Sequence, residues 1–199
     1  MNKDILICGV GGQGTVLASR IIAASAMAEG NVVHSAETIG MAQRGGPVTS
    51  HVRIGEDAYS PLIPFGKADI IIGFEPSEVV RNLKYLAKDG IAVVNTTPVK
   101  PVTASLTDSG YDGREMLEYL KKNVSCVFAD GEKECQKLGS LKFLNILLLG
   151  IAAGSGRLGI SRDTMTAEIE ERVPSKFREA NLKAFLAGYQ LGQTNNQEG

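Results

Sequence analysis

Short apolar runs alternate with segments of helical periodicity in the first part of the chain. Residues 5–8 form an uninterrupted apolar run that ends at a cluster of glycines, which is typical of a strand buried on both faces of a parallel sheet. Beyond the glycines, apolar residues recur at helical spacing over residues 16–24, and residues 32–35 predict a second strand. Residues 4–35 therefore predict a strand, a glycine loop, a helix and a strand, which together make one βαβ unit.

Further strands are expected in the middle of the chain. Residues 48–54 alternate apolar and polar positions, which predicts a half-buried strand and fits an antiparallel hairpin at the sheet edge. Residues 69–74 predict another buried strand. Pro76 is expected to open a helix that Gly90 closes, and residues 91–95 predict the strand that follows.

The rest of the chain is mostly helical. One strand is expected at residues 124–128, and helices are expected at residues 113–122, 141–158, about 161–172 and 175–191. The polar tail at residues 194–199 is expected to fray. Strands that alternate with helices and then give way to a helical C-terminal segment predict a single Rossmann-like α/β domain over residues 1–199, with a mostly parallel sheet flanked by helices.

Composition narrows the possible classes of protein. With 199 residues, 43% hydrophobic and 22% charged, the chain has the size and make-up of an ordinary globular domain. The net charge of −1 gives no field that would attract nucleic acid or anionic lipid. The apolar run at residues 146–153 is too short to span a bilayer, and the N-terminus lacks the features of a signal peptide. We therefore expect a cytoplasmic protein with neither nucleic acid nor membrane as a partner.

The residues that usually bind metals are sparse. Cys8, Cys126 and Cys135 are odd in number and widely spaced, and no CxxC pair occurs, so neither a disulfide framework nor a zinc or iron–sulfur site is expected in this chain. His34 and His51 have no cysteine or carboxylate at ligand spacing. Both are interpreted as structural histidines, and no metal ligand is assigned.

No set of catalytic residues stands out either. The serines lack a nucleophile-elbow context, and nothing resembles a Walker lysine or a magnesium site. Glu168, Glu170 and Glu171 are expected on a polar, solvated helix face. The sequence therefore assigns no catalytic acid, base or nucleophile.

The glycine cluster is the first candidate binding element. Residues 9–14 read GVGGQG, which matches GxGxxG after a predicted strand and before a predicted helix. Glycine allows a tight turn and close approach of a ligand, and a helix N-terminus offers free N–H groups to a phosphate. The candidate cofactor-binding residues here are Gly9, Gly11, Gly12, Gln13 and Gly14. The alternative is that the glycines only permit close packing and that the Gln13 amide is an exposed polar group.

A dinucleotide site also needs an acidic residue near the end of the second strand, where it binds the ribose. That strand is expected to end near Ser35, and the nearest acid, Glu37, comes late. This spacing argues against ordinary NAD binding.

A second candidate element is the loop around Arg44. This guanidinium stands beside Gly45 and Gly46 in a loop between strands. Arginine binds carboxylate or phosphate through two parallel hydrogen bonds, and such loops flank the ligand crevice of open α/β sheets. Arg44, Gly45 and Gly46 are therefore candidates for a ligand or subunit contact. The alternative is a surface salt bridge.

The two elements together carry a resemblance to a known family. GVGGQG at residues 9–14, with MAQRGG at residues 41–46, resembles the gamma-type subunit of 2-oxoacid:ferredoxin oxidoreductases, and the likeness is greatest to the beta subunit of indolepyruvate ferredoxin oxidoreductase. Further matches cover nearly the whole chain: Val52 to Ile54, Ala68-Asp69, Glu75-Pro76, Val94-Asn95, Asn181, Ala184-Phe185 and Gly188. The pair of motifs is far more specific than a lone GxGxxG.

The resemblance implies a function that composition does not. Such complexes oxidatively decarboxylate a 2-oxoacid on thiamine diphosphate, pass electrons through iron–sulfur clusters to ferredoxin, and form an acyl-CoA. The family places thiamine diphosphate and the clusters on a large partner subunit, with coenzyme A as co-substrate. The resemblance therefore implies a hetero-oligomer of anaerobic metabolism in which this chain is inactive alone and binds none of these cofactors by itself. The glycine loop and Arg44 would face the coenzyme or the partner's active site.

Two other classes of function stay open from the residues alone. A stand-alone module would bind a nucleotide or phosphate tightly without any partner. A structural scaffold would use its glycines only for packing, so that Gly11→Ala and Arg44→Ala would harm assembly and nothing else. The 2-oxoacid itself is not encoded here, because selectivity for its side chain belongs near thiamine diphosphate on the partner.

Overall fold

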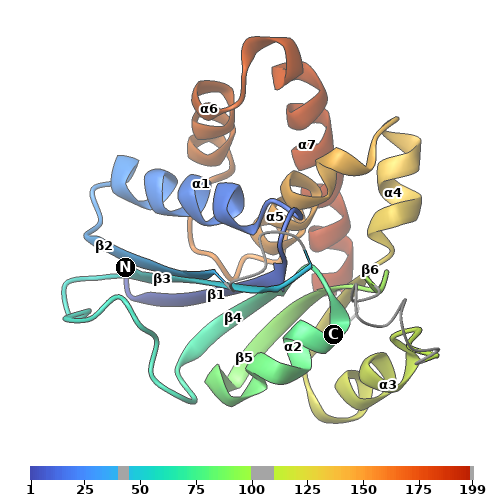
Figure 1. Cartoon of the computed structure of the whole chain (residues 1–199). Helices are drawn as coiled ribbons and strands as arrows, with labels where there is room; N and C mark the ends of the chain where they lie inside the picture. Colours follow the sequence, from blue (N-terminus) through green and yellow to red (C-terminus); the bar gives the residue numbers. More distant parts are fainter. Residues whose placement is uncertain (40–44, 100–109, 198–199) are drawn as a thin grey trace.

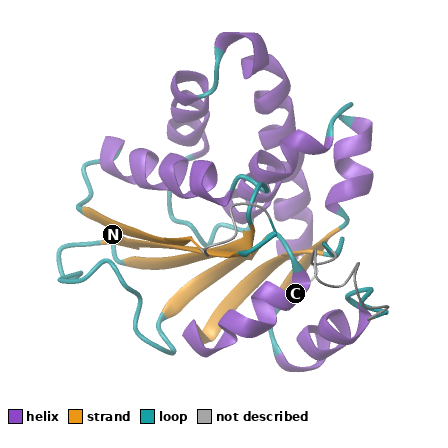
Figure 2. Ribbon diagram, in the orientation of Figure 1, coloured by secondary structure: helices purple, strands orange, loops and turns teal. Residues whose placement is uncertain are grey.

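The computed structural model describes residues 1–39, 45–99 and 110–197. Within these residues, six strands form one mixed sheet between two layers of helices (Figure 1, Figure 2). The strands are β1 (Lys3–Val10), β2 (Val33–Ile39), β3 (Pro47–Ile54), β4 (Ala68–Gly73), β5 (Leu86–Asn95) and β6 (Cys126–Ala129), in the order β2-β3-β1-β4-β5-β6. The predicted α/β class, with a mostly parallel sheet, is confirmed.

The helices divide between the two faces of this sheet. The α-helices are α1 (Thr15–Ala28), α2 (Pro76–Asn82), α3 (Arg114–Asn123), α4 (Gly131–Lys137), α5 (Leu144–Gly154), α6 (Arg162–Arg172) and α7 (Arg178–Gln197), and the short 3-10 helices are η1 (Leu83–Tyr85), η3 (Leu141–Phe143) and η4 (Ser175–Phe177). One face is covered by α2 and α3, and the other by α1, α5, α6 and α7 (Figure 1).

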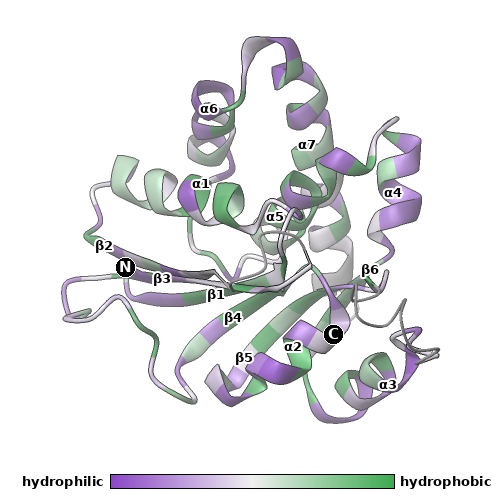
Figure 3. Cartoon of the chain, viewed as in Figure 1, coloured by the Kyte–Doolittle hydropathy of each residue, from purple (hydrophilic) through white to green (hydrophobic). Residues whose placement is uncertain are grey.

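The continuous apolar runs arise because both faces of the sheet are buried. In β1, Ile5 and Ile7 point into the cluster under α1, α5 and α7, whereas Leu6 and Cys8 point into the cluster under α2 and α3. All four side chains are fully buried, and full burial of an aliphatic side chain contributes about 1.5–3 kcal/mol. Figure 3 shows the contrast between the largely hydrophobic strands β4 and β5 and the more hydrophilic outer helices α4 and α6.

The order of the first three strands differs from the expected βαβ unit. β2 and β1 are not neighbours, because β3 lies between them and pairs antiparallel with both. The chain between Ile39 and Pro47 is too short for a crossover, so β3 has to return beside β2 as a hairpin. The antiparallel hairpin at the sheet edge is thus confirmed, and the second strand runs on to Ile39 instead of ending at Ser35.

The helix expected between Pro76 and Gly90 is much shorter than predicted. It begins at Pro76 as expected but ends at Asn82, and β5 already starts at Leu86. Gly90 lies inside β5, where an added Cβ would come within 2.7 Å of the Ala68 carbonyl oxygen. The glycine therefore allows β4 and β5 to approach closely, next to an irregularity in their register. Glycine commonly takes this role inside strands.

The C-terminal half contains two further departures from the prediction. Helix α4 was not expected, although Asp130 accepts a hydrogen bond from the backbone N–H of Lys133 and caps it. Helix α7 continues to Gln197, through most of the tail that was expected to fray. The predicted helix at residues 113–122 and strand at residues 124–128 are confirmed by α3 and β6, within two residues at their ends.

Four glycines let α5 and α7 cross with their backbones in direct contact. They are Gly150 and Gly154 on α5 and Gly188 and Gly192 on α7. An added Cβ at Gly188 would lie 2.1 Å from the Leu147 carbonyl oxygen, and one at Gly150 would lie 2.2 Å from the Phe185 carbonyl oxygen. The long C-terminal helix is fixed to the core by this crossing.

Among the described helices, none is by itself long and apolar enough to cross a membrane; Gly131–Lys137 and Leu141–Gly154 reach the required length and composition only as a pair, with a bend of 118° between them.

Candidate functional site

The loops at one edge of the sheet form the candidate site. Strands β1, β4, β5 and β6 are parallel, so their carboxyl ends meet at the same edge, which is where open α/β sheets bind ligands. Because β3 is antiparallel to β1, the start of β3 also lies there, with Pro47 opposite Val10. The topology therefore brings the GVGGQG segment and the pair Gly45-Gly46 to one place.

The two glycine segments are joined by backbone hydrogen bonds. The Gly11 N–H donates to the Gly46 carbonyl oxygen at 2.8 Å, and the Gly45 N–H donates to the Gly11 carbonyl oxygen at 3.4 Å. The sequence analysis treated the two segments as separate loops. Residues 9–14 and 45–46 instead form one unit at the carboxyl edge, which we call the double glycine loop. Arg44 lies outside the described residues.

The glycines of GVGGQG have different reasons to be glycine. An added Cβ at Gly9 would lie 2.8 Å from Phe74 Cβ, and one at Gly14 would lie 2.6 Å from Asn145 Nδ2, so these two permit close packing. Gly12 differs, because nothing lies within 4 Å of its added Cβ, while its φ of +99° favours glycine. The packing alternative therefore explains Gly9 and Gly14, and Gly12 is the position that leaves backbone open to a ligand.

Gln13 uses its amide to fasten this loop. Its Oε1 accepts a hydrogen bond from the Val10 N–H at 2.8 Å, and its Nε2 donates to the Phe74 carbonyl oxygen at 3.0 Å. The alternative of a merely exposed polar residue is wrong. Gln13 ties the end of β1 to the end of β4.

Asn95 makes a second tie, which sequence reasoning missed. Its side chain is buried, with Nδ2 donating to the same Phe74 carbonyl oxygen at 3.0 Å and Oδ1 accepting from the Gly131 N–H at 3.1 Å. Phe74 follows β4, Asn95 ends β5 and Gly131 follows β6, so one amide links three strand ends. A polar residue directly after the apolar run of β5 was the available signal.

A pocket of about 200 Å³ opens beside these two amides. Its lining residues are Gln13, Asn95, Thr97, Val99, Gly131, Glu132, Leu141 and Leu144. The lining combines the aliphatic side chains of Val99, Leu141 and Leu144 with the two amides, a combination that suits an apolar ligand segment containing a hydrogen-bonding group.

A carboxylate at the end of β4 organises the neighbouring loop. Glu75 caps α2 by accepting the Glu78 N–H at 3.1 Å, and it also accepts the hydroxyl of Tyr111. Burial, reinforced by this hydrogen bond, raises the pKa of Tyr111 to about 12. Burial and the nearby Glu75 also raise the pKa of Glu78, against the opposing Arg81 at 3.0 Å. Tyr111 thereby holds the segment before α3 at the same edge.

The three thiols lack the character of nucleophiles. Burial raises the pKa of Cys8 well above its ordinary value, with Glu78 and Glu75 adding to the effect. Burial likewise raises the pKa of Cys126 and of Cys135 to about 11 each. Thiols with raised pKa values are protonated and inert near neutral pH. Among the residues that the structure describes, no three His, Cys, Asp or Glu side chains gather as a possible metal site.

His51 is a structural histidine, as predicted. Its ring is buried, and Nδ1 accepts a hydrogen bond from the Ile63 N–H at 3.2 Å. The ring also meets Tyr85 edge-on, with centroids 5.3 Å apart. Burial lowers the pKa of His51, although the charge of Asp4 works in the opposite direction.

We expect the neutral His51 ring to make stability depend on pH. Because the pKa is lower in the folded state, the unfolded chain binds the proton more readily, so this contribution is complete above about pH 6.5 and is lost as the pH falls through the folded value. His51→Gln removes the titration. Chemical denaturation between about pH 7 and about pH 5 should show a smaller loss of stability in the variant than in the parent chain. Equal losses would show that His51 does not titrate on unfolding.

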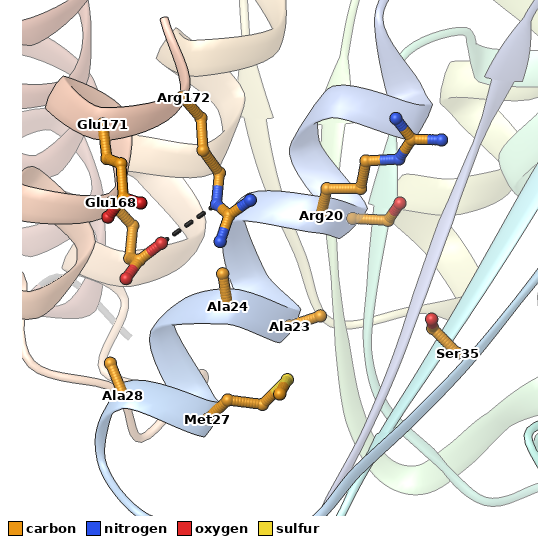
Figure 4. Close-up of a pocket in the computed structure, with 10 residues that line it drawn as sticks. Arg20, Ala23, Ala24, Met27, Ala28, Ser35, Glu168, Glu171 and Arg172 are labelled. Atoms are coloured by element: carbon orange, nitrogen blue, oxygen red, sulfur yellow. Dashed lines mark hydrogen bonds and ion pairs between the residues drawn. The ribbon is translucent and has the colours of Figure 1, made fainter.

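A second hollow, of about 480 Å³, is lined by residues of α1, β2 and α6 (Figure 4). Both of its arginines are already paired, since Arg172 Nε lies 2.9 Å from Glu168 and Arg20 Nε lies 3.8 Å from Glu37. Glu168 is therefore paired and only 13% exposed, not solvated as predicted. Glu37 also accepts the Ser19 hydroxyl at 3.4 Å, and β3 separates its strand from the glycine loop. We do not assign a site here.

Comparison with known proteins places the chain in a family. The model of the pyruvate ferredoxin/flavodoxin oxidoreductase family matches residues 4–191. The chain therefore belongs to this family, as a gamma-type subunit of a 2-oxoacid:ferredoxin oxidoreductase. It is 38% identical to the indolepyruvate oxidoreductase subunit IorB of Archaeoglobus fulgidus, covering 95% of this chain and 94% of that one. It is 35% identical to the IorB subunit of Thermococcus kodakarensis, covering 93% of each.

Solved structures share the fold. The gamma subunit of a keto/oxoacid ferredoxin oxidoreductase from Geobacter sulfurreducens superposes with a TM-score of 0.71 at 23% identity, over 96% of this chain and 99% of that one. A 2-oxoglutarate:ferredoxin oxidoreductase from Magnetococcus marinus, solved with 2-oxoglutarate, coenzyme A and succinyl-CoA bound, gives 0.75 at 18% identity. The match covers 97% of this chain and 31% of that one. In that protein the fold is therefore one part of a longer polypeptide.

Proposed function

We propose that this chain is the smaller subunit of a complex that oxidatively decarboxylates an aryl pyruvate such as indolepyruvate, forms an acyl-CoA and reduces ferredoxin. The observation that carries the proposal is the double glycine loop, in which Gly11 and Gly46 are hydrogen-bonded at the carboxyl edge beside the 200 Å³ pocket. The names of the relatives support the indolepyruvate type. We place the complex in the cytoplasm, with the whole chain acting as one domain.

The carboxyl edge is suited to the coenzyme. Helix α1 begins at Thr15, and its N-cap residue Gly14 has no side chain to cap it, so the first N–H groups of the helix are available to an anion. Gly12 presents open backbone beside them. We propose that these groups, with Arg44, Gly45 and Gly46, hold phosphate groups of coenzyme A, and that the aliphatic side chains of the pocket contact an uncharged part of the same molecule.

Thiamine diphosphate and the iron–sulfur clusters belong, in this proposal, to the larger partner subunit. Thiamine diphosphate supplies the carbanion chemistry of decarboxylation there. The chain described here contributes binding and orientation: it fixes the coenzyme at the carboxyl edge and shields it from water. Cys8, Cys126 and Cys135 lie on β1, β6 and α4, and among the described residues no three His, Cys, Asp or Glu side chains gather, which supports this division.

The alternative of a stand-alone nucleotide- or phosphate-binding module has less support. In a dinucleotide fold the ribose-binding acid ends the strand beside β1. Here that neighbour is β3, and the nearest acid, Glu37, lies one strand further out and binds Ser19 and Arg20. No described carboxylate at the end of β2 therefore reaches the glycine loop.

The proposal is tested by reconstitution under anaerobic conditions. The chain and the larger subunit are produced together, and 2-oxoacid-dependent dye reduction is measured with indolepyruvate and coenzyme A. We expect a brown complex with activity and no activity from the isolated chain. A colourless chain that finds no partner but binds a nucleotide by itself would establish the stand-alone module instead.

One variant tests the coenzyme contact within that complex. Gly12→Ala adds a methyl group to open backbone, so we expect the KM for coenzyme A to rise at least about 10-fold while kcat falls less. The matched control is Gly30→Ala, because Gly30 also has a positive φ (+80°) and open space, but lies at the other end of α1. Equal KM values in the two variants would show that Gly12 does not face the coenzyme.

A further inference from the structure

The loop between β3 and β4 exposes three large apolar side chains. Tyr59 is 93% exposed, Phe65 66% and Leu62 53%. The loop leaves β3 after Ile54, opposite the start of β1, so it lies at the amino edge of the parallel strands (Figure 1). It is therefore at the opposite side of the sheet from the double glycine loop. Apolar groups that gather in water mark interaction sites more often than single exposed residues do.

This loop is held in place from beneath. The Arg53 guanidinium donates to the carbonyl oxygens of Ser60 at 3.0 Å and Leu62 at 3.5 Å, and it is fixed in turn by Asp4 at 2.7 Å. Between the exposed residues, Ile63 is buried and its N–H donates to His51. The apolar groups are thus presented in a fixed arrangement, which reduces the entropy lost on binding a partner.

The exposed residues continue into η1. The Phe65 ring meets Tyr85 with centroids 5.0 Å apart, and the Lys84 ammonium lies 5.0 Å from the Phe65 centroid. The Gly66 N–H donates to the Lys84 carbonyl oxygen at 2.9 Å. We define the aromatic face as Tyr59, Leu62, Phe65 and Tyr85 with the lysines Lys67 and Lys84. A hollow of about 330 Å³ lies at η1 and the start of β5. Its lining includes Leu83, Leu86 and Tyr119.

Charge indicates the kind of partner. Lys67 and Lys84 are exposed beside Phe65, and Lys88 and Asp89 are exposed at the neighbouring hollow, so lysines outnumber carboxylates there, whereas the exposed Glu56 and Asp57 stand at the far end of the loop. Aromatic centres with a charged rim are typical of sites for a different protein with opposite charges.

We propose that the aromatic face is the docking surface for the larger subunit of the complex, which would present apolar side chains surrounded by carboxylates. This inference rests on the proposed function. It assigns the two edges of the sheet to two tasks: the carboxyl edge faces the coenzyme, and the amino edge anchors the subunit. Side chains of the partner would bury the exposed rings of Tyr59 and Phe65.

The test compares two double variants produced together with the larger subunit. Tyr59→Ser with Phe65→Ser removes the two most exposed rings of the aromatic face. Met27→Ser with Leu186→Ser is the matched control, because these side chains are 61% and 42% exposed on α1 and α7. We expect the first pair to weaken the complex at least about 10-fold and the second to leave it unchanged. Thermal unfolding of each isolated chain checks that the fold is retained.

Salt and oligomeric state complete the test. Raising the salt from about 0.1 to about 0.5 M should weaken the parent complex, and Lys67→Glu should weaken it in the same direction. If the parent chain forms the complex and the aromatic double variant binds equally well, the docking surface is wrong while the proposed function stands. If the parent chain forms no complex at all, the proposed function itself fails. An isolated chain whose dimer is broken by the aromatic variant, with the complex unaffected, would overturn the inference in favour of self-association.

Discussion

Gly188→Ala is expected to destabilise the protein strongly, although alanine is the better helix former. The new Cβ would lie 2.1 Å from the Leu147 carbonyl oxygen, so α5 and α7 must move apart along their whole crossing. Overpacking of this kind costs about 3 kcal/mol, and alanine recovers about 1 kcal/mol of helix propensity. The expected net loss is roughly 2 kcal/mol, equivalent to a fall in Tm of about 4–8 °C.

The measurement is thermal and denaturant unfolding of the isolated chain, with Gln193→Ala as control. Gln193 is exposed on the same helix, so this substitution changes helix propensity without a clash. Gly150→Ala addresses the same crossing, because its added Cβ would lie 3.1 Å from Gly188 Cα. One separation of the helices relieves both clashes, so the double variant should lose less than the sum of the single losses. Unchanged stability in Gly188→Ala would show that the helices adjust without cost.

Much of the fold could be predicted because the local signal and the burial agree. The apolar run at residues 5–8 predicts a strand buried on both faces, and its alternate side chains do enter the two different clusters. The glycine loop after it, and the helix beginning at Thr15, follow from the same local pattern. Where both faces of an element are buried, the sequence of that element is sufficient to predict it.

The errors arose where a residue serves a partner that is distant in sequence. In the sequence, Gly90 looks like the residue that ends a helix. The structure shows that glycine is needed there because the Ala68 carbonyl oxygen approaches it from the neighbouring strand. The position of β3 between β2 and β1 depends on the direct return of the chain after Ile39, which apolar periodicity does not reveal. Local patterns indicate which residues are buried, but they do not indicate which other residues those side chains pack against.

The candidate site shows the same limit. The sequence identified both glycine segments, but their contact is made by backbone atoms of Gly11, Gly45 and Gly46, which carry no side-chain signal. The shared partner of Gln13 and Asn95 is a carbonyl oxygen, that of Phe74, to which the identity of residue 74 contributes nothing. Such contacts become visible only once the strand order is known.

Asn95→Leu is expected to damage both stability and activity, because it leaves buried backbone groups without partners. The side chain has nearly the same shape but cannot accept the Gly131 N–H, and the Phe74 carbonyl oxygen keeps only its bond from Gln13. One buried polar group left unpaired costs about 1–3 kcal/mol. The ends of β4, β5 and β6 lose their common tie, and we expect kcat/KM for coenzyme A in the complex to fall at least about 10-fold.

Two further variants separate the role of this amide from a general loss of packing. Asn123→Leu removes an exposed amide that bonds only to the Tyr119 carbonyl oxygen, and it should cost less than about 0.5 kcal/mol. Asn95→Asp keeps the acceptor for Gly131 but turns a carboxylate toward the Phe74 carbonyl oxygen, which raises the pKa of the new carboxyl group. Its stability relative to the parent should therefore be best at low pH and decrease as the pH rises through the folded pKa. A pH-independent difference would show that the pKa of this carboxyl group does not change on folding, which contradicts a buried position facing the Phe74 carbonyl oxygen.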